Sequence, residues 1–151
     1  MAYKRIIIKG EGVRNERVAN AAITPGMLVE LMSTGKVRAH ANAGQPAQKS
    51  FAVEDDLQGN AISDAYAADA LVQYDIMRPG DVVYAFLKNG ENAVIGSLLE
   101  SAGNGELQVY TADSAGIVEY PNSIVGQAIE AVDMSDSSAA DPAGRILVEI
   151  L

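Results

Sequence analysis

Short runs of apolar residues, separated by turns that contain glycine, recur along most of the chain. Each run has the length of a β-strand, and residues 36–41 alternate polar and apolar positions with a period of two. Many short strands at spacings of about 8–12 residues are typical of antiparallel sandwiches and barrels. The pattern therefore predicts a mainly β protein, with a small antiparallel β-barrel or sandwich body and only short helical turns. The predicted strands are residues 27–32, 36–41, 51–54, 82–87, 93–100, 107–110, 117–120, 124–132 and 145–151.

The turn signals are as regular as the apolar runs. Pro25-Gly26 and Pro79-Gly80 each precede a predicted strand, because proline presets φ and glycine accepts a positive φ. Asn89-Gly90 predicts a hairpin that pairs the strands on either side of it. Residues 55–78 are the least regular segment. The alanines between positions 61 and 74 favour a helical turn or two, without the apolar stripe of a long helix.

The first twenty residues differ in charge from the rest of the chain. They hold five basic and two acidic residues (net +3), whereas the remainder holds six basic and eighteen acidic residues (net −12). A basic segment on an acidic body favours an arm with a partner of its own. The alternative is that scattered cations only solubilise a frayed end. We therefore divide the chain into an N-terminal extended arm, residues 1–20, and a β-rich domain, residues 21–151.

The arm contains a short apolar strand flanked by cations and followed by Gly10 and Gly12. An unpaired strand can add to the edge of another chain's sheet through main-chain hydrogen bonds. The glycines, together with Asn15, favour a segment that can reorient, although the strand could equally pair within its own barrel. The candidate partner-binding residues are Tyr3, Lys4, Arg5, Ile6, Ile7, Ile8, Lys9, Arg14 and Arg17.

Composition narrows the classes of function. The 151 residues include no cysteine, which excludes disulfides, thiolate catalysis and cysteine metal sites. The net charge of −9 argues against coating nucleic acid, because phosphates would be repelled. No apolar stretch is long enough for a signal peptide or a membrane span. We therefore expect a soluble protein, made in the cytoplasm, with no direct nucleic-acid or membrane partner.

One segment carries a weak enzyme signal. Gly10 and Gly12 follow a predicted strand, and Glu30 lies about twenty residues further on, which is similar in spacing to a dinucleotide-binding fingerprint. Asn15 stands where the third glycine of that fingerprint belongs. The chain also lacks the alternating strand–helix pattern of a parallel sheet. A nucleotide site is therefore the least favoured interpretation of this segment.

The isolated polar residues do not assemble a site in the sequence. His40 lies on the same side of its predicted strand as Arg38, which predicts exposure to solvent. Residues 133–137 resemble the start of a calcium loop, but the loop lacks the glycine at its sixth position and the glutamate at its twelfth. Asp55 and Asp56 are adjacent, so in a strand they would point to opposite faces. We expect no catalytic residue, no metal ligand and no cofactor.

The order of the elements resembles that of a known family. The segments that carry the resemblance are residues 51–54, 59 with 62–66, 79–85, 96–105, 124–131 and 145–150. It is a resemblance to the head decoration, or capsid cement, proteins of tailed bacteriophages. The likeness covers about residues 23–151 and depends on patterned motifs rather than on chemically unique ones. The front segment is longer and more basic than in the shortest relatives, and no contact residue follows from the motifs.

The resemblance implies a function in the virion. A protein of this family would form a homotrimer on the outside of a mature phage capsid, with its arm spread across neighbouring subunits of the major capsid protein. It would stabilise the shell by binding, without catalysis and without a cofactor. One alternative is another β-barrel assembly module, such as a tail or head-completion protein or an oligomeric binding domain of the host. A more remote alternative is a nucleotide-dependent enzyme built on Gly10 and Gly12.

Overall fold

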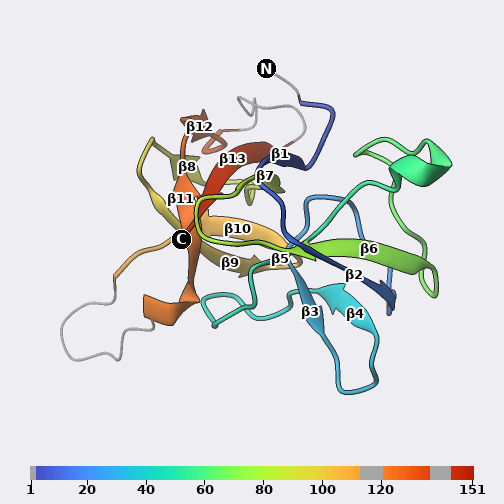
Figure 1. The fold of residues 1–151 in the computed structure, drawn as a ribbon. Helices are drawn as coiled ribbons and strands as arrows, with labels where there is room; N and C mark the ends of the chain where they lie inside the picture. Colours follow the sequence, from blue (N-terminus) through green and yellow to red (C-terminus); the bar gives the residue numbers. More distant parts are fainter. Residues whose placement is uncertain (1–2, 113–120, 137–143) are drawn as a thin grey trace.

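The computed structural model describes residues 3–112, 121–136 and 144–151. They form strands and two short 3₁₀ turns, η1 (Asp56–Gln58) and η2 (Pro121–Ser123), so the predicted mainly β fold is confirmed (Figure 1). The strands are β1 (Ile7–Lys9), β2 (Val13–Val18), β3 (Val29–Leu31), β4 (Val37–Ala39), β5 (Ser50–Ala52), β6 (Leu71–Ile76), β7 (Val82–Phe86), β8 (Asn92–Ala93), β9 (Leu98–Gly103), β10 (Glu106–Val109), β11 (Ile124–Ala128), β12 (Val132–Asp133) and β13 (Arg145–Ile150).

Antiparallel pairing arranges these strands into one large sheet and three smaller ones. The large sheet has six strands in the order β1-β7-β13-β11-β9-β10, and a second sheet has the order β2-β6-β5. β3 pairs with β4, and β8 pairs with β12. The end strands of the large sheet, β1 and β10, do not pair with each other, so the described residues form a sandwich-like body and not a closed barrel. The strand predicted at 117–120 lies outside the described residues.

The main core lies on one face of the large sheet. Val83 of β7 and Val148 of β13 are cross-strand partners, and both are fully buried in this core. Tyr84 and Leu147 are the next pair and point to the opposite face, where they form a smaller apolar cluster with Val82. β7 is thus buried on both faces, which explains its continuous apolar sequence.

The second sheet encloses its own apolar cluster around Val72 and Tyr74 of β6. This central strand lies in the segment with the least regular sequence. The helical turns expected between residues 61 and 74 do not form, because residues 61–70 make turns and an isolated bridge and β6 begins at Leu71. β6 has a neighbour on each side that shares its main-chain hydrogen bonds, and a helix would leave the facing groups of β2 and β5 unpaired.

The hairpin predicted at Asn89-Gly90 is wrong in its strand pairing. The turn itself forms, since Gly90 has a φ of 98° and Glu91 N donates to Lys88 O at 3.2 Å. However, β7 pairs with β1 and β13, and the strand after the turn, β8, pairs with β12 over two residues. β13 offers β7 five paired positions and buries side chains on both faces. Burial in the tertiary structure therefore outweighs the local turn signal.

Arg145, at the start of β13, ties the large sheet to the loops that cover it. Its side chain is buried, with Nη1 donating to Tyr84 O at 3.3 Å and Nη2 donating to Ile62 O at 3.0 Å. The guanidinium also lies over the Phe86 ring, 4.0 Å from the ring centroid. A Cβ at Gly26 would overlap with Nη1, so the turn at Gly26 packs directly on this arginine. One side chain thereby holds together segments that are distant in the sequence.

Replacing Arg145 with methionine should lower the free energy of unfolding by about 2–5 kcal/mol. Methionine keeps much of the volume but leaves the carbonyl oxygens of Tyr84 and Ile62 without this donor, and each such buried group costs about 1–3 kcal/mol. Urea denaturation measures the difference. Arg38→Met is the matched control, because Arg38 makes a half-exposed ion pair with Glu30 and its loss should cost less than about 1 kcal/mol. Equal losses in the two variants would contradict this role of Arg145.

Candidate interaction surface

The N-terminal segment, residues 3–18, crosses the two largest sheets and is called the strap below. β1 adds to the edge of the large sheet, with Ile7 opposite Val83, and β2 adds to the edge of the second sheet by pairing with all six residues of β6. Figure 1 shows the strap passing from one sheet to the other. The sequence left open whether the apolar strand of the arm pairs with another chain or within its own body. In the structure the strand pairs within its own body and does not project as a free arm.

The apolar side of the strap packs on this body. Ile6 is fully buried, and its carbonyl oxygen accepts from Tyr84 N at 2.8 Å. Ile7 packs against the main core, and Ile8 packs against the smaller cluster on the other face of the large sheet. The Tyr3 ring meets the Tyr84 ring edge-on, with 5.2 Å between the ring centroids. These four residues, predicted to bind a partner, therefore pack on their own chain.

Gly10 and Gly12, between β1 and β2, are required by close packing. A Cβ at Gly10 would overlap with the Asp81 carboxylate, and a Cβ at Gly12 would lie 2.7 Å from Ile76 O. Gly10 also has a φ of 90°, which other residues rarely adopt. The glycines thus allow the strap to approach the body, and a role in reorientation is not needed to explain them. β2 follows Gly12 where a dinucleotide site needs a helix N-terminus, so the nucleotide interpretation fails on geometry as well.

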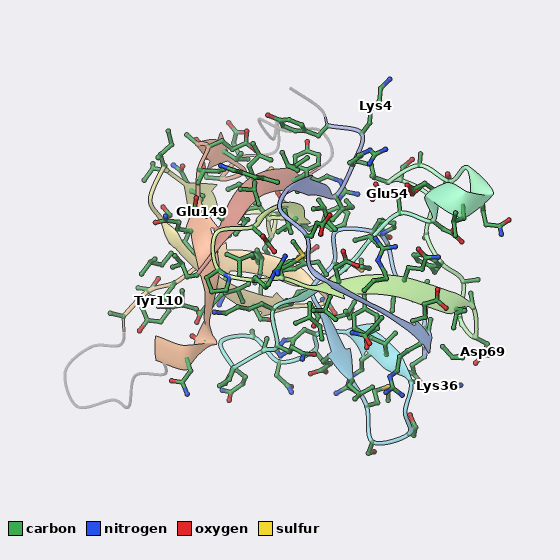
Figure 2. The ribbon with its side chains drawn as sticks, viewed as in Figure 1. Lys4, Lys36, Glu54, Asp69, Tyr110 and Glu149 are labelled. Carbon is green, nitrogen blue, oxygen red and sulfur yellow. The ribbon has the colours of Figure 1, made fainter. Side chains whose placement is uncertain are left out.

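Three cations of the strap point away from the body. Lys4, Arg5 and Lys9 are exposed, and their side chains make no hydrogen bond or ion pair with the described residues. Figure 2 shows the Lys4 side chain extending outward at one end of the molecule. An exposed cation without a partner in its own chain contributes its whole charge to the field that a partner molecule meets. These residues are the part of the predicted arm site that is exposed and has no side-chain partner among the described residues.

The two cations of β2 are engaged within the chain. Arg14 forms an ion pair with the buried Asp75 and donates to Gln73 Oε1 at 2.9 Å. Burial lowers the pKa of the Arg14 guanidinium, but the hydrogen bond and the charge of Asp75 outweigh this effect and the pKa is raised. Arg17 Nη1 donates to Gly35 O at 3.4 Å. Arg14 and Arg17 therefore attach the strap to β6 and to the turn between β3 and β4.

His40, predicted to face solvent, is only 2% exposed, so that prediction is wrong. The β3–β4 hairpin packs against the turn between β9 and β10, where Gly105 N donates to His40 O at 3.1 Å. The imidazole Nδ1 lies 2.6 Å from Ser101 Oγ, and Nε2 lies 3.6 Å from Glu30 Oε2. Serine, histidine and carboxylate together are the groups of a hydrolase triad. Ser101 is 0% exposed, however, so a substrate cannot reach Oγ in this structure, and the three side chains form a buried polar network.

The carboxylates noted in the sequence do not assemble a metal site. Asp133 accepts hydrogen bonds from the hydroxyl and the N–H of Ser135, and these bonds lower the pKa of its carboxyl. They close a local turn. The later positions of the calcium-like loop, 137 and 138, lie outside the described residues. Among the residues that the structure describes, no three His, Asp or Glu side chains could hold a metal ion, and no helix is long and apolar enough to cross a membrane.

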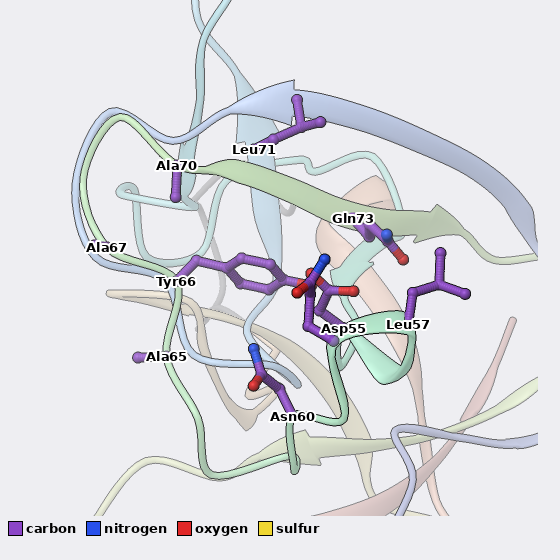
Figure 3. Close-up of a pocket in the computed structure, with 10 residues that line it drawn as sticks. Asp55, Leu57, Asn60, Ala65, Tyr66, Ala67, Ala70, Leu71 and Gln73 are labelled. Carbon is purple, nitrogen blue, oxygen red and sulfur yellow. The ribbon is translucent and has the colours of Figure 1, made fainter.

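A pocket of about 480 Å³ lies between β6 and the loop of residues 55–70. Figure 3 shows the Tyr66 ring extending from this loop toward Asp55. Tyr66 OH donates to Val53 O at 2.7 Å, and burial raises the pKa of Tyr66 to about 12. No pattern in the sequence indicated this pocket, because its residues come from a loop and a strand that only folding brings together. They are Asp55, Leu57, Gln58, Asn60, Ala65, Tyr66, Ala67, Ala70, Leu71 and Gln73.

Comparison with known proteins identifies the fold. No protein-family model and no curated protein match the sequence. The chain is similar to a solved structure, the crystal structure of the head fiber gp8.5 N base in bacteriophage phi29. The similarity covers 92% of this chain and 93% of that chain, with a TM-score of 0.55 and 11% sequence identity. At this identity the match shows a shared fold, which extends over nearly the whole of both chains.

Replacing Ile6 with alanine should lower the free energy of unfolding by about 2–4 kcal/mol, because the lost side chain is fully buried where the strap joins the large sheet. Lys4→Ala is the control within the strap. It removes an exposed side chain and should change stability by less than about 0.5 kcal/mol. Urea denaturation compares the variants. If the Ile6 variant were as stable as the wild type, the strap would be a detachable arm.

Tyr66 should ionise only near pH 12, whereas an ordinary tyrosine ionises near pH 10. Because the folded-state pKa is raised, the neutral phenol stabilises the fold below about pH 10, and this contribution is lost as the pH rises to about 12. An alkaline titration followed by tyrosinate absorbance should contain one late component, which Tyr66→Phe removes. A titration curve with the same late component in the variant would contradict the assignment.

Proposed function

We propose that this protein is a structural component of a bacteriophage head: a decoration, or cement, protein that binds the outer surface of the capsid. In this proposal it acts as a homotrimer, bridges neighbouring subunits of the major capsid protein and stabilises the shell. It does so without catalysis, and it needs no cofactor, nucleic acid or membrane. It is made in the host cytoplasm and becomes part of the virion.

The observation that carries the proposal is the fold shared with the phi29 head fiber base, over 92% of this chain and 93% of that one. A fold by itself does not imply a function. The proposal therefore also uses the resemblance of residues 23–151 to phage head decoration proteins. A comparison of backbones and a comparison of sequence patterns thus support the same class, a protein on the head of a phage.

The charge distribution suits attachment to a capsid surface. The side chains of Lys4, Arg5 and Lys9 face solvent without a partner in the part of the chain that the structure describes, and they lie on a chain whose net charge is −9. In the proposed complex these cations contact acidic side chains of a capsid subunit. The acidic remainder of the chain faces solvent and keeps free copies from aggregating.

The outer edge of β2 offers a second kind of contact. Gln73 O accepts from Val53 N at 3.0 Å, so the main-chain groups of Gln73 face β5. Glu16 is the partner of Gln73 on β2, and its main-chain groups therefore face away from β6. An extended segment of a capsid subunit could pair with this edge. The charged side chains of Arg14 and Glu16 would select that segment and oppose unspecific pairing.

Because the proposed trimer carries three straps, each single contact with the capsid can be weak and the trimer can still bind tightly. Once one strap of a trimer has bound, the second and third contacts become intramolecular, which can raise avidity by about 10²–10⁴. A protein that binds only the closed lattice also stabilises that lattice by mass action. Binding alone could therefore help the capsid shell to withstand the pressure of packed DNA, with no catalytic step.

A second candidate function is suggested by the printed description of the similar structure, which is the base of a head fiber. A fibre base would attach to the head and carry a further structure, but it need not strengthen the shell. The two candidates differ in one measurement. Heads saturated with a cement protein should resist heating better than bare heads, whereas heads saturated with a fibre base should not.

Purified expanded heads should bind the full chain saturably, and light scattering should report a trimer in solution. The double variant Lys4→Glu/Arg5→Glu should raise the dissociation constant for heads by at least about tenfold at low salt, because rim charges steer and hold the complex. Lys49→Glu/Lys88→Glu is the control, since it changes the net charge equally and neither side chain makes a hydrogen bond or ion pair with the strap. Absence of saturable binding would refute the proposal, and equal weakening by both variants would refute the role of the strap.

A further inference from the structure

The pocket between β6 and residues 55–70 contains a carboxylate with an unsatisfied oxygen. Asp55 Oδ1 is shielded from solvent and has no hydrogen-bond partner among the described residues. Its main chain, in contrast, is engaged, because the Asp55 carbonyl accepts from Gln58 N at 3.2 Å and from Asn60 N at 3.1 Å. A buried acceptor without a donor is costly. A ligand that brings a donor to this carboxylate would remove that cost.

The walls of the pocket suit an aliphatic stem. Leu57 is 89% exposed and Leu71 is 54% exposed, and Ala65 and Ala70 add small apolar surface on the side of the pocket away from Leu57 (Figure 3). The hydroxyl of Tyr66 is already used, since it donates to Val53 O. The complementary ligand therefore combines an apolar chain with a terminal donor, as the side chains of lysine and arginine do.

Charge favours a cationic donor over a neutral one. Residues 54–69 contain five acidic residues and no basic residue. Arg14 is close by on β2, but its guanidinium is held by Asp75 and Gln73. Lys36 Nζ lies 2.8 Å from Asp69 Oδ1 in an exposed ion pair, so this cation is engaged as well, and among the described residues no donor reaches Asp55 Oδ1. The pocket thus fits an ammonium or a guanidinium group on an aliphatic stem.

We propose that this pocket binds Arg5 of a second copy of the chain. Arg5 is an exposed cation of the strap whose side chain makes no hydrogen bond or ion pair with the described residues, and it lies next to the buried Ile6, whose N–H donates to Glu54 Oε2 at 3.2 Å and fixes this part of the strap. Its planar guanidinium can pair with both oxygens of the Asp55 carboxylate once that side chain turns Oδ1 from its shielded position into the pocket, and the Lys4 ammonium lacks this two-pronged geometry. Each copy then places its own Arg5 in the pocket of one neighbour and receives Arg5 from another neighbour. Such a head-to-tail contact can close into a ring. This inference depends on the self-association in the proposed function.

Sedimentation equilibrium of the full chain tests the contact. Asp55→Asn keeps the size of the side chain but removes its charge, and it should raise the dissociation constant of the assembly by at least about tenfold. Asp56→Asn is the matched control, because it removes the same charge from the adjacent residue, which does not line the pocket. It should change the constant by less than about threefold. Circular dichroism checks that both variants remain folded.

A charge exchange makes the test specific. Asp55→Arg and Arg5→Asp should each weaken assembly, and the double variant should restore it to within about threefold of the wild type. A monomeric wild type, equal effects of Asp55→Asn and Asp56→Asn, or failure of the double variant would each overturn the inference. If the trimer binds heads but ignores Asp55→Asn, the pocket contact fails and the proposed function stands. If Asp55→Asn dissociates the assembly but the wild-type assembly does not bind heads, the pocket contact stands and the proposed function fails.

Discussion

The strap joins the two largest sheets, because β1 and β2 are consecutive in the chain but pair with β7 and β6, which belong to different sheets. Removing the strap would expose one edge of each sheet. It would also expose the apolar surface on which Ile6 packs. The approach is so close that Gly10 and Gly12 have no room for a side chain. The relative placement of the two sheets and the exposure of Lys4, Arg5 and Lys9 depend on this pairing.

The strap combines two roles on its two sides. Its apolar residues, such as Ile6 and Ile8, hold it to the body, while Lys4, Arg5 and Lys9 face outward. An attachment segment that is already ordered loses less conformational entropy on binding than a disordered arm would. In the proposed function, where many copies bind one lattice, a rigid cationic strap would therefore be a suitable attachment element.

Buried polar side chains complete the body. Arg145 connects β7, the loop at Ile62 and the turn at Gly26, and His40 connects β4 to Ser101 of β9. In both cases the side chain satisfies groups that come from distant segments, which favours one packing over alternatives. Such rigidity agrees with a protein that acts by presenting a fixed surface.

The sequence by itself determined the mainly β class, most strand positions, the turns and the charge contrast of the first twenty residues, because these depend on residues close together in the chain. Tertiary structure alone decided the partners of β7, the burial of His40, the strand β6 and the pairing of the strap. It also brought Asp55 and Leu71 into one pocket. Each of these outcomes depends on which distant surface covers a segment, and a local pattern of apolar and polar residues does not contain that information.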